Sequence, residues 1–212
     1  CLFLLGYIVV LAKSNKYIMN NIDIIKTNFD ESRETNSLAT ESILSIIDKA
    51  TSKIIMMLEN SGKLMTCGNG GSSGDAQHIA SEFINRFETE RESLAAISLN
   101  SDTATLTSIG NDYGYKYIFS KQINALAKPN DILMAFTTSG NSENILDAII
   151  TAKSKNLSVI LISGGSGGKA AGLLDDNDIK IIVPSKRTSR IQEIHLIIIH
   201  SICECIDKYL SK

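Results

Sequence analysis

The feature that most constrains the fold is an alternation of short apolar runs with helical patterns after Gly62. Five runs have the character of buried strands: 63–67, 94–99, 131–136, 158–163 and 179–183. Helical patterns follow most of them, at 75–87, 117–127, 142–155, 169–174 and 187–210. Buried strands separated by helices are typical of a parallel sheet covered on both faces. The pattern predicts an α/β fold, a doubly wound five-stranded parallel sheet flanked by helices.

Residues 19–62 form a helical extension ahead of this core. Apolar residues recur there at intervals of three and four, and we expect two helices separated near Thr35–Ser37, with Ser37 or Thr40 as an N-cap. Such apolar helices either cover a sheet or pair with another subunit. The chain is then one domain, 19–212, with N-terminal helices at 19–62 and an α/β core at 63–212.

Residues 1–18 are set apart from this domain. The segment 2–12 is apolar for eleven residues, which is too short to span a bilayer, and no basic segment precedes it as in a signal peptide. We expect an upstream or non-native segment and no membrane contact. A membrane anchor or a truncated signal is the alternative.

Charge and cysteine content narrow the class of protein. The formal net charge of −2 gives no basic footprint, so we expect no direct nucleic-acid ligand. The four cysteines do not form a framework of the secreted kind, and Cys203 and Cys205 point in different directions on a helix. Reduced thiols and a cytoplasmic location are the expectation.

Two small polar loops follow the first and third predicted strands. The first contains Asn69, Gly70, Gly71 and Ser72, and the second contains Thr137, Thr138, Ser139 and Ser142. A strand, a short polar turn and a helix N-terminus present free N–H groups to an anion. Since the carboxyl ends of parallel strands meet at one crevice, the loops predict a single phosphate site. The alternative for Ser142 is a plain N-cap, with Glu143 in the first turn.

A third turn, 164–168, is rich in glycine but has no polar companion, so we interpret it as a connection rather than a ligand contact. Neither polar loop has the spacing of a Walker motif or of a dinucleotide fingerprint.

Candidate acid, base and metal groups lie on two helices. His78 and Glu82, four residues apart, project from one helix face about 6 Å from each other, although a surface pair without function would look the same. The last helix adds Gln192, Glu193, His195 and His200. Isoleucines surround His200 in the sequence, which predicts a largely buried helix, where a histidine either has a fixed partner or takes part in chemistry. Gln192 and His200 are separated by about 12 Å along the helix and roughly 80° around it. A shared ion would therefore require a distortion, long reach or a symmetry-related subunit.

These motifs together resemble the SIS-domain phosphosugar isomerases, and within them the phosphoheptose isomerases. The matching elements run in order from about residue 20: CGNGGS at 67–72, DAQH at 75–78 with Glu82, GNDYG at 110–114, TTSGNS at 137–142, and RIQEIH at 190–195 with His200. The resemblance implies a homotetramer with active sites at subunit contacts. It also implies conversion of sedoheptulose 7-phosphate, a phosphorylated seven-carbon sugar, to glycero-manno-heptose 7-phosphate for surface polysaccharide.

The resemblance also implies roles for individual residues. Glu82 and His200 match the proton-transfer pair, and the zinc ligands match His78, Glu82, Gln192 and His200. Substrate contacts match Asn69, Gly70, Gly71, Ser72, Glu82, Asn111, Asp112, Thr137, Thr138, Ser139, Ser142 and Gln192. Two positions depart from the family pattern, because Ser189 stands where Asp is common and Thr137 replaces a Ser.

A second resemblance belongs to another functional class. The segment 84–91, and the region from Leu173 to Arg190, are similar to the DnaA-initiator-associating protein, a tetrameric adaptor of the same fold that regulates replication initiation. That family lacks acidic and histidine residues at the positions of Glu82 and His200, so their presence here favours the enzyme over an adaptor that binds DnaA. A phosphosugar sensor is a third interpretation, disfavoured because the sequence has no attached DNA-binding region.

Overall fold

A five-stranded parallel sheet forms the centre of the computed structural model, which describes residues 2–211, with side chains from residue 20 onward. The strand order is β2-β1-β3-β4-β5, and every neighbouring pair is parallel. The strands are β1 (Leu64–Gly68), β2 (Ala96–Ser98), β3 (Ile132–Phe136), β4 (Ser158–Gly164) and β5 (Ile179–Val183). All five predicted runs are strands, so the predicted fold class is confirmed.

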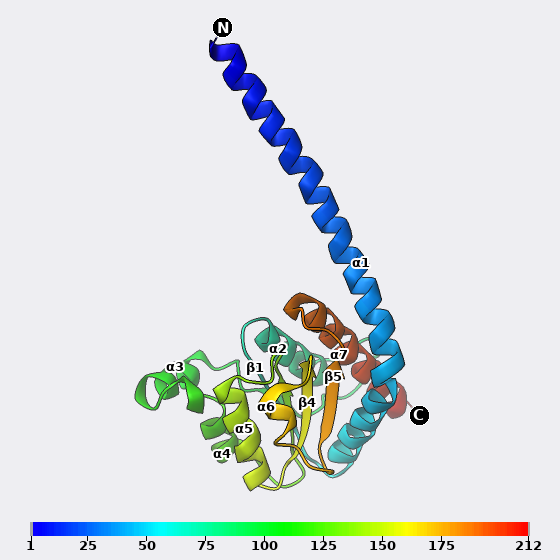
Figure 1. Ribbon diagram of the computed structural model, residues 1–212. Helices are drawn as coiled ribbons and strands as arrows, with labels where there is room; N and C mark the ends of the chain where they lie inside the picture. Colours follow the sequence, from blue (N-terminus) through cyan, green and yellow to red (C-terminus); the bar gives the residue numbers. More distant parts are fainter. Residues whose placement is uncertain (1, 212) are drawn as a thin grey trace.

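Helices cover both faces of the sheet (Figure 1). One face carries α1 (Leu2–Glu59), α2 (Gly71–Ile84) and α7 (Thr188–Leu210). On the opposite face of the sheet lie α3 (Thr103–Asp112), the 3-10 helix η1 (Tyr115–Tyr117), α4 (Ser120–Leu126), α5 (Glu143–Ser154) and α6 (Gly168–Ala171). This is the doubly wound arrangement that buried strands without strict polar alternation require.

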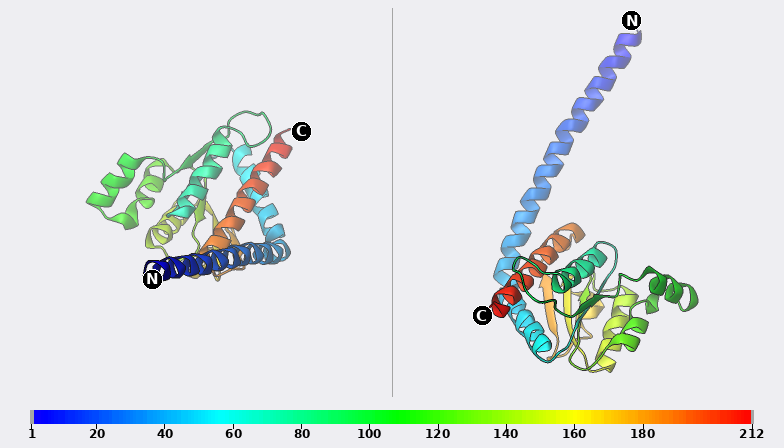
Figure 2. Two further views of the ribbon diagram at one scale, coloured as in Figure 1. Left: turned by 90° about the horizontal axis from the view of Figure 1, so that it is seen from above. Right: turned by 180° about the vertical axis from the view of Figure 1, so that it is seen from behind.

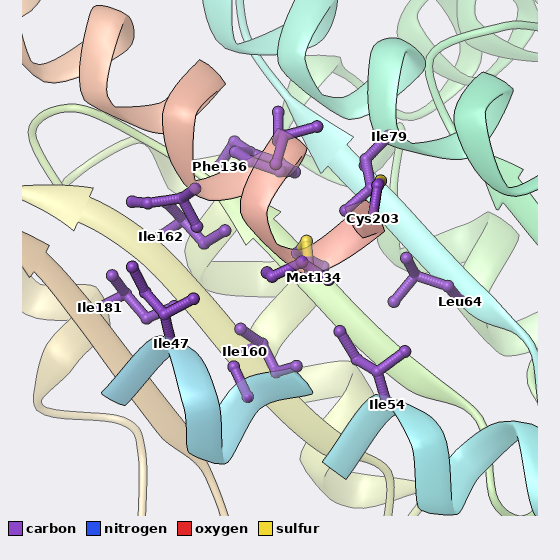
Figure 3. Close-up of a cluster of buried hydrophobic side chains, with 14 of the residues drawn as sticks. Ile47, Ile54, Leu64, Ile79, Met134, Phe136, Ile160, Ile162, Ile181 and Cys203 are labelled. Atoms are coloured by element: carbon purple, nitrogen blue, oxygen red, sulfur yellow. The ribbon is translucent and has the colours of Figure 1, made fainter. Parts of the chain in front are cut away.

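Two apolar cores result, one on each face of the sheet. Alternate strand residues point to opposite faces. Met134 and Ile160 therefore pack under α1, while Leu133 and Val159 pack under α5. Figure 3 shows the first core, where Ile47 of α1 and other apolar side chains meet the strands. The sheet is thus held from both sides, which leaves its carboxyl edge for ligand binding.

The N-terminal extension is a single helix, and our expectation of two helices was wrong. Helix α1 continues through Thr35–Ser37 without a break, and Figure 1 shows it changing direction as it reaches the body of the molecule. The hydroxyl of Thr40, expected as a possible N-cap, donates instead to the Asn36 carbonyl inside the helix at 2.9 Å. Polar residues satisfied in this way do not end a helix.

Helix α3 was not predicted, because its sequence TATLTSIGND has little apolar periodicity. Its start is nonetheless well defined. The Asp102 carboxylate accepts hydrogen bonds from the N–H groups of Ala104 and Thr105, which is the usual N-cap arrangement. Within the described chain, no helix is long and apolar enough to cross a membrane.

The strand order identifies the place for a ligand. β1 lies between β2 and β3, so the chain leaves β1 toward one side and later returns to its other side. Ligands of doubly wound sheets bind at such a switch point, beyond the carboxyl ends of the strands. The loops after β1 and β3 meet there, as predicted.

Candidate active site

The loop after β1 is shaped by glycine. Gly70 has φ 55°, in the left-handed region that favours glycine, and it directly precedes α2. A Cβ at Gly68 would overlap the Ser72 carbonyl, so the first turn of α2 packs on the end of the strand. The Ser72 N–H donates to Asn69 O at 3.0 Å, and the Ser73 N–H donates to Gly70 O at 3.0 Å. The loop therefore leads directly into the N-terminus of α2, and a helix N-terminus attracts anions.

The loop after β3 leads into α5 in a similar way. Thr137 Oγ1 accepts the Gly140 N–H at 3.1 Å and closes the turn. Ser142 occupies the N-cap position, but its hydroxyl forms no capping hydrogen bond within the described residues. The plain N-cap interpretation of Ser142 is therefore not what the structure contains. This hydroxyl can serve a ligand.

The glycine-rich turn 164–168 supports the loop after β3 from behind. Gly140 has φ 66°, and a Cβ there would overlap the Gly167 carbonyl. The Ala170 N–H donates to Gly140 O at 2.9 Å, and the Lys169 N–H donates to Asn141 Oδ1 at 3.1 Å. The turn thus connects β4 to α6 and packs against the loop after β3.

A pair of amides joins the two loops. The Asn69 Nδ2 donates to Asn144 Oδ1 at 2.8 Å, and the Asn144 Nδ2 donates back to Asn69 Oδ1 at the same distance. The Tyr115 hydroxyl donates to Asn69 Oδ1 at 3.0 Å. Sequence reasoning missed Asn144 and Tyr115, because neither stands in a glycine-rich loop or has a periodic signal. Their hydrogen bonds join the two halves of the predicted phosphate site.

Helices α2 and α7 lie side by side and run in the same direction (Figure 2). Near the start of α2, a Cβ at Gly71 would overlap the Gln192 amide. Further along, the His78 and His200 rings are 5.1 Å apart between centroids, with an edge-to-face angle of 70°. Contacts thus advance together along both helices, and functional side chains from each meet in one seam.

Three of the predicted acid, base and metal residues gather in this seam. His78 Nε2 lies 3.1 Å from Glu82 Oε1, and both side chains are partly exposed. Phe87 stacks on His200 with the ring centroids 5.4 Å apart. His78, Glu82 and His200 therefore form a compact polar group on the surface of α2 and α7.

The buried histidine of α7 is His195, whereas His200 is exposed, so the expectation that His200 is enclosed by its apolar neighbours was wrong. His195 is 0% exposed, with Nδ1 3.5 Å from Asp75 Oδ2 and Nε2 3.5 Å from the Ser163 carbonyl oxygen. It joins α7 to α2 and to β4. His200, five residues further on, points out toward His78.

The predicted metal set is only partly assembled in one chain. Gln192 of α7 packs against Gly71 at the start of α2, whereas His78 and Glu82 lie about two and three turns further along that helix. Two imidazoles bound to one tetrahedral zinc have ring centres about 5 Å apart, given Zn–N bonds of roughly 2.0–2.1 Å. The His78 and His200 rings fit that spacing. Among the described residues, however, no three His, Cys, Asp or Glu side chains already converge as a metal site.

Asn111 and Asp112 lie at the exposed end of α3, with the Asn111 Nδ2 donating to Asp112 Oδ1 at 2.9 Å. Their segment reaches the phosphate loops through Tyr115, which follows three residues later and contacts Asn69. They stand at the rim of the site rather than between the two loops.

Two cysteines lie close to the site but are chemically quiet. Burial raises the pKa of the Cys67 thiol, on β1, to about 12. Burial, reinforced by the negative charges of Glu82 and Asp207, raises the pKa of Cys203 to about 12 as well. Both thiols stay protonated at neutral pH and are poor nucleophiles.

Comparison with known proteins shows the family to which a chain with this fold and this seam belongs. A family model described as the SIS domain matches residues 28–164, and the chain belongs to that family. Within it, the chain belongs to the phosphoheptose isomerases. It is 50% identical over 189 residues to phosphoheptose isomerase from Alteromonas mediterranea, covering 89% of this chain and 96% of that protein.

Solved structures agree with this placement. A phosphoheptose isomerase from Francisella tularensis has a TM-score of 0.87 at 41% identity, covering 89% of this chain and 98% of that one. Phosphoheptose isomerase GmhA from Neisseria gonorrhoeae has a TM-score of 0.84 at 41% identity, covering 88% and 98%. The chain is a phosphosugar isomerase, and the adaptor alternative, binding DnaA, has no support from these relatives.

Proposed function

We propose that this chain converts sedoheptulose 7-phosphate to D-glycero-D-manno-heptose 7-phosphate through an enediol, in heptose synthesis for surface polysaccharide. The observation that carries the proposal is the layout of α2, which starts in the phosphate loops and bears Glu82 further along one side. Relatives named phosphoheptose isomerase, which align over 89% of the chain, support the choice of substrate.

The length of α2 between its functional residues suits a long sugar phosphate. Ten residues separate Ser72 from Glu82, which corresponds to about 15 Å of helix, and side chains tilt back toward the N-terminus. A substrate with its phosphate at the start of α2 can therefore place carbons at its far end beside Glu82. In a seven-carbon ketose 7-phosphate, the reacting C1 and C2 are at that far end.

Glu82 and His200 are the proposed proton-transfer pair. Glu82 takes a proton from C1 while a proton is delivered to the C2 oxygen, which gives the enediol. Return of a proton to C2 and loss of the C1 hydroxyl proton then give the aldose. His200 lies near His78 and Glu82 and is exposed, so it can exchange protons at the two oxygens.

Zinc is the proposed cofactor, and His78, Glu82, Gln192 and His200 are the residues that would hold it. A bound zinc would act as a Lewis acid on the substrate oxygens. Since Gln192 lies apart from the other three in one chain, we propose that a second copy completes the set. Thermal denaturation with and without added zinc tests this independently of turnover. We expect zinc to raise the melting temperature of the wild-type protein. An equal rise in a variant that carries both His78→Ala and His200→Ala would contradict the assignment.

A homotetramer in the cytoplasm is part of the proposal. Ile22, Ile25 and Phe29 of α1 are more than half exposed, and their spacing places them along one side of the helix. An apolar stripe of this kind suits another copy of the chain. Light scattering should give four times the 23.0 kDa chain mass.

The most direct test is to incubate purified protein, with zinc, with sedoheptulose 7-phosphate and to follow aldose formation. We expect turnover with this substrate and a much lower kcat/KM with a six-carbon ketose 6-phosphate, whose reacting carbons do not reach Glu82. Equal rates with both would contradict the length argument. Absence of turnover with the seven-carbon substrate would contradict the proposed function.

A further inference from the structure

Residues 85–95, here called the strap, lead from the end of α2 across α7 to β2. Residues 85–91 of the strap belong to the segment whose sequence resembles an adaptor, and the isomerase chemistry described above does not use the strap. Phe87 of the strap stacks on His200. The strap therefore touches the proposed proton-transfer pair from the side opposite the phosphate loops.

Arg91 closes the strap onto the end of α2. Its guanidinium donates from Nη2 to the Glu82 carbonyl at 2.8 Å and from Nη1 to the Phe83 carbonyl at 3.1 Å. Carbonyls in the last turn of a helix have no helical partner, and a cation is favourable there. Arg91 thus holds the backbone of the residue that carries the proposed base.

Asp207 receives the other side of this guanidinium. Arg91 Nε donates to Asp207 Oδ1 at 2.7 Å, and the two side chains are 8% and 2% exposed. Asp207 Oδ2 accepts the N–H groups of Glu88 and Thr89 at 3.2 and 3.1 Å, which directly follow Phe87. Asp207 is seven residues after His200 on α7, so it lies about two turns further along the same side of the helix.

We propose that Arg91 and Asp207, here called the clamp, are positioning residues that set the placement of Glu82 relative to His200. Arg91 donates a hydrogen bond to the backbone of Glu82. Asp207 binds the backbone of the two residues that follow Phe87, and so holds the Phe87 ring against His200. The inference rests on the proposed isomerase function. Both side chains are almost fully buried, so the clamp acts through Glu82 and His200 rather than on the substrate itself.

A merely structural ion pair is the competing explanation, and the chain contains a matched control. Asp178 is also a buried carboxylate that accepts two backbone N–H groups, from Val159 and Asp175, and one cation, the Lys153 ammonium at 2.6 Å. It lies between α5 and the β4–β5 side of the sheet. Asp178→Asn should lower the melting temperature as Asp207→Asn does, while leaving kcat unchanged.

The kinetic test compares Arg91→Lys, Asp207→Asn and Asp178→Asn with the full-length enzyme. Lysine keeps the charge beside Asp207 but cannot fork to both helix carbonyls. We expect each clamp variant to lose about 10- to 100-fold in kcat, as small misplacements of reacting groups do. KM should change by less than about twofold. Clamp variants with unchanged kcat per folded enzyme, or an equal loss in Asp178→Asn, would overturn the proposal.

A second readout does not depend on turnover. In protein labelled at histidine carbons, the ring C–H resonance of His200 senses the ring current of Phe87, and Phe87→Leu supplies the reference shift. Asp207→Asn should move the resonance toward that reference, and Asp178→Asn should leave it in place. An unmoved resonance in Asp207→Asn overturns the clamp even if the wild-type protein does not isomerise the sugar, whereas failure of wild-type turnover alone speaks only against the proposed function.

Discussion

The two ends of α2 are built in different ways. At its N-terminus, glycines and backbone N–H groups form the proposed phosphate site, and the Asn69–Asn144 amide pair joins the two loops. Toward its C-terminus, the polar group consists of side chains from two helices, with His78 and Glu82 partly exposed and His200 exposed. Under the proposed function, binding of the phosphate depends on local backbone geometry, whereas proton transfer depends on how α2 and α7 are held together.

The largest effect should come from removing the proposed base, Glu82, toward the C-terminal end of α2. Glu82→Gln preserves size and the helix but cannot accept a proton from carbon, so kcat should fall by about 10²–10⁴-fold. Binding of inorganic phosphate, followed by calorimetry, should be unchanged because the loops are intact. Glu204→Gln, on the exposed side of α7, is the control. A fully active Glu82→Gln enzyme would show that the base lies elsewhere.

The next effect should come from the N-terminal end, through the support of its second loop. Gly140→Ala places a side chain at φ 66° and against the Gly167 carbonyl, so the free energy of unfolding should fall by at least about 1–3 kcal/mol. Phosphate affinity should fall with it.

Gly74→Ala in α2 is a matched control for that substitution. Its Cβ would meet no atom of the described chain within 4 Å, and the residue lies in a helix interior. It should stabilise the protein by about 0.5–1 kcal/mol in urea denaturation. Equal losses in both variants would mean that the close contact at Gly140 is unimportant.

A smaller effect should appear in acid, at the C-terminal end. Burial opposes ionisation of Asp207, but hydrogen bonds from Arg91 and from the N–H groups of Thr89 and Glu88 outweigh it, so the Asp207 pKa lies below its ordinary value of 3.8. Since the folded-state pKa is the lower one, this stabilisation is present above pH 3.8 and is lost as the pH falls through the folded-state pKa. When the free energy of unfolding is measured with urea at several acidic pH values, it should depend less steeply on pH in Asp207→Asn than in wild type. Identical slopes would contradict this.

The smallest change in stability should follow Ser142→Ala. Because the hydroxyl forms no capping hydrogen bond within the described residues, the free energy of unfolding should stay within about 0.5 kcal/mol. KM for the sugar phosphate should nevertheless rise, since a hydroxyl donor is lost from the loop. A clear loss of stability with an unchanged KM would return Ser142 to the role of a plain cap.

The same contrast explains what the sequence could predict. Gly70 and Ser72 could be assigned because a strand, a glycine turn and a helix start are adjacent in the chain. Asn144 and Asp207 could not, since their partners are 75 and up to 119 residues away and leave no periodic signal. His195 and His200 were also not distinguished. The isoleucines of α7 lie on most sides of the helix, so the sequence pattern does not show which side is buried.

Helix α6 packs behind the loop after β3, where Gly140 contacts Gly167, so its backbone amides can report whether the site is occupied. The amide hydrogens of Lys169 and Ala170 bond to Asn141 and to Gly140, so they can exchange with solvent deuterium only when the loop opens. A sugar phosphate that holds this loop closed will slow exchange at two amides that never contact it. Occupancy of the site can thus be followed from α6, by mass spectrometry of a single peptide, without a chromophore or a coupled enzyme.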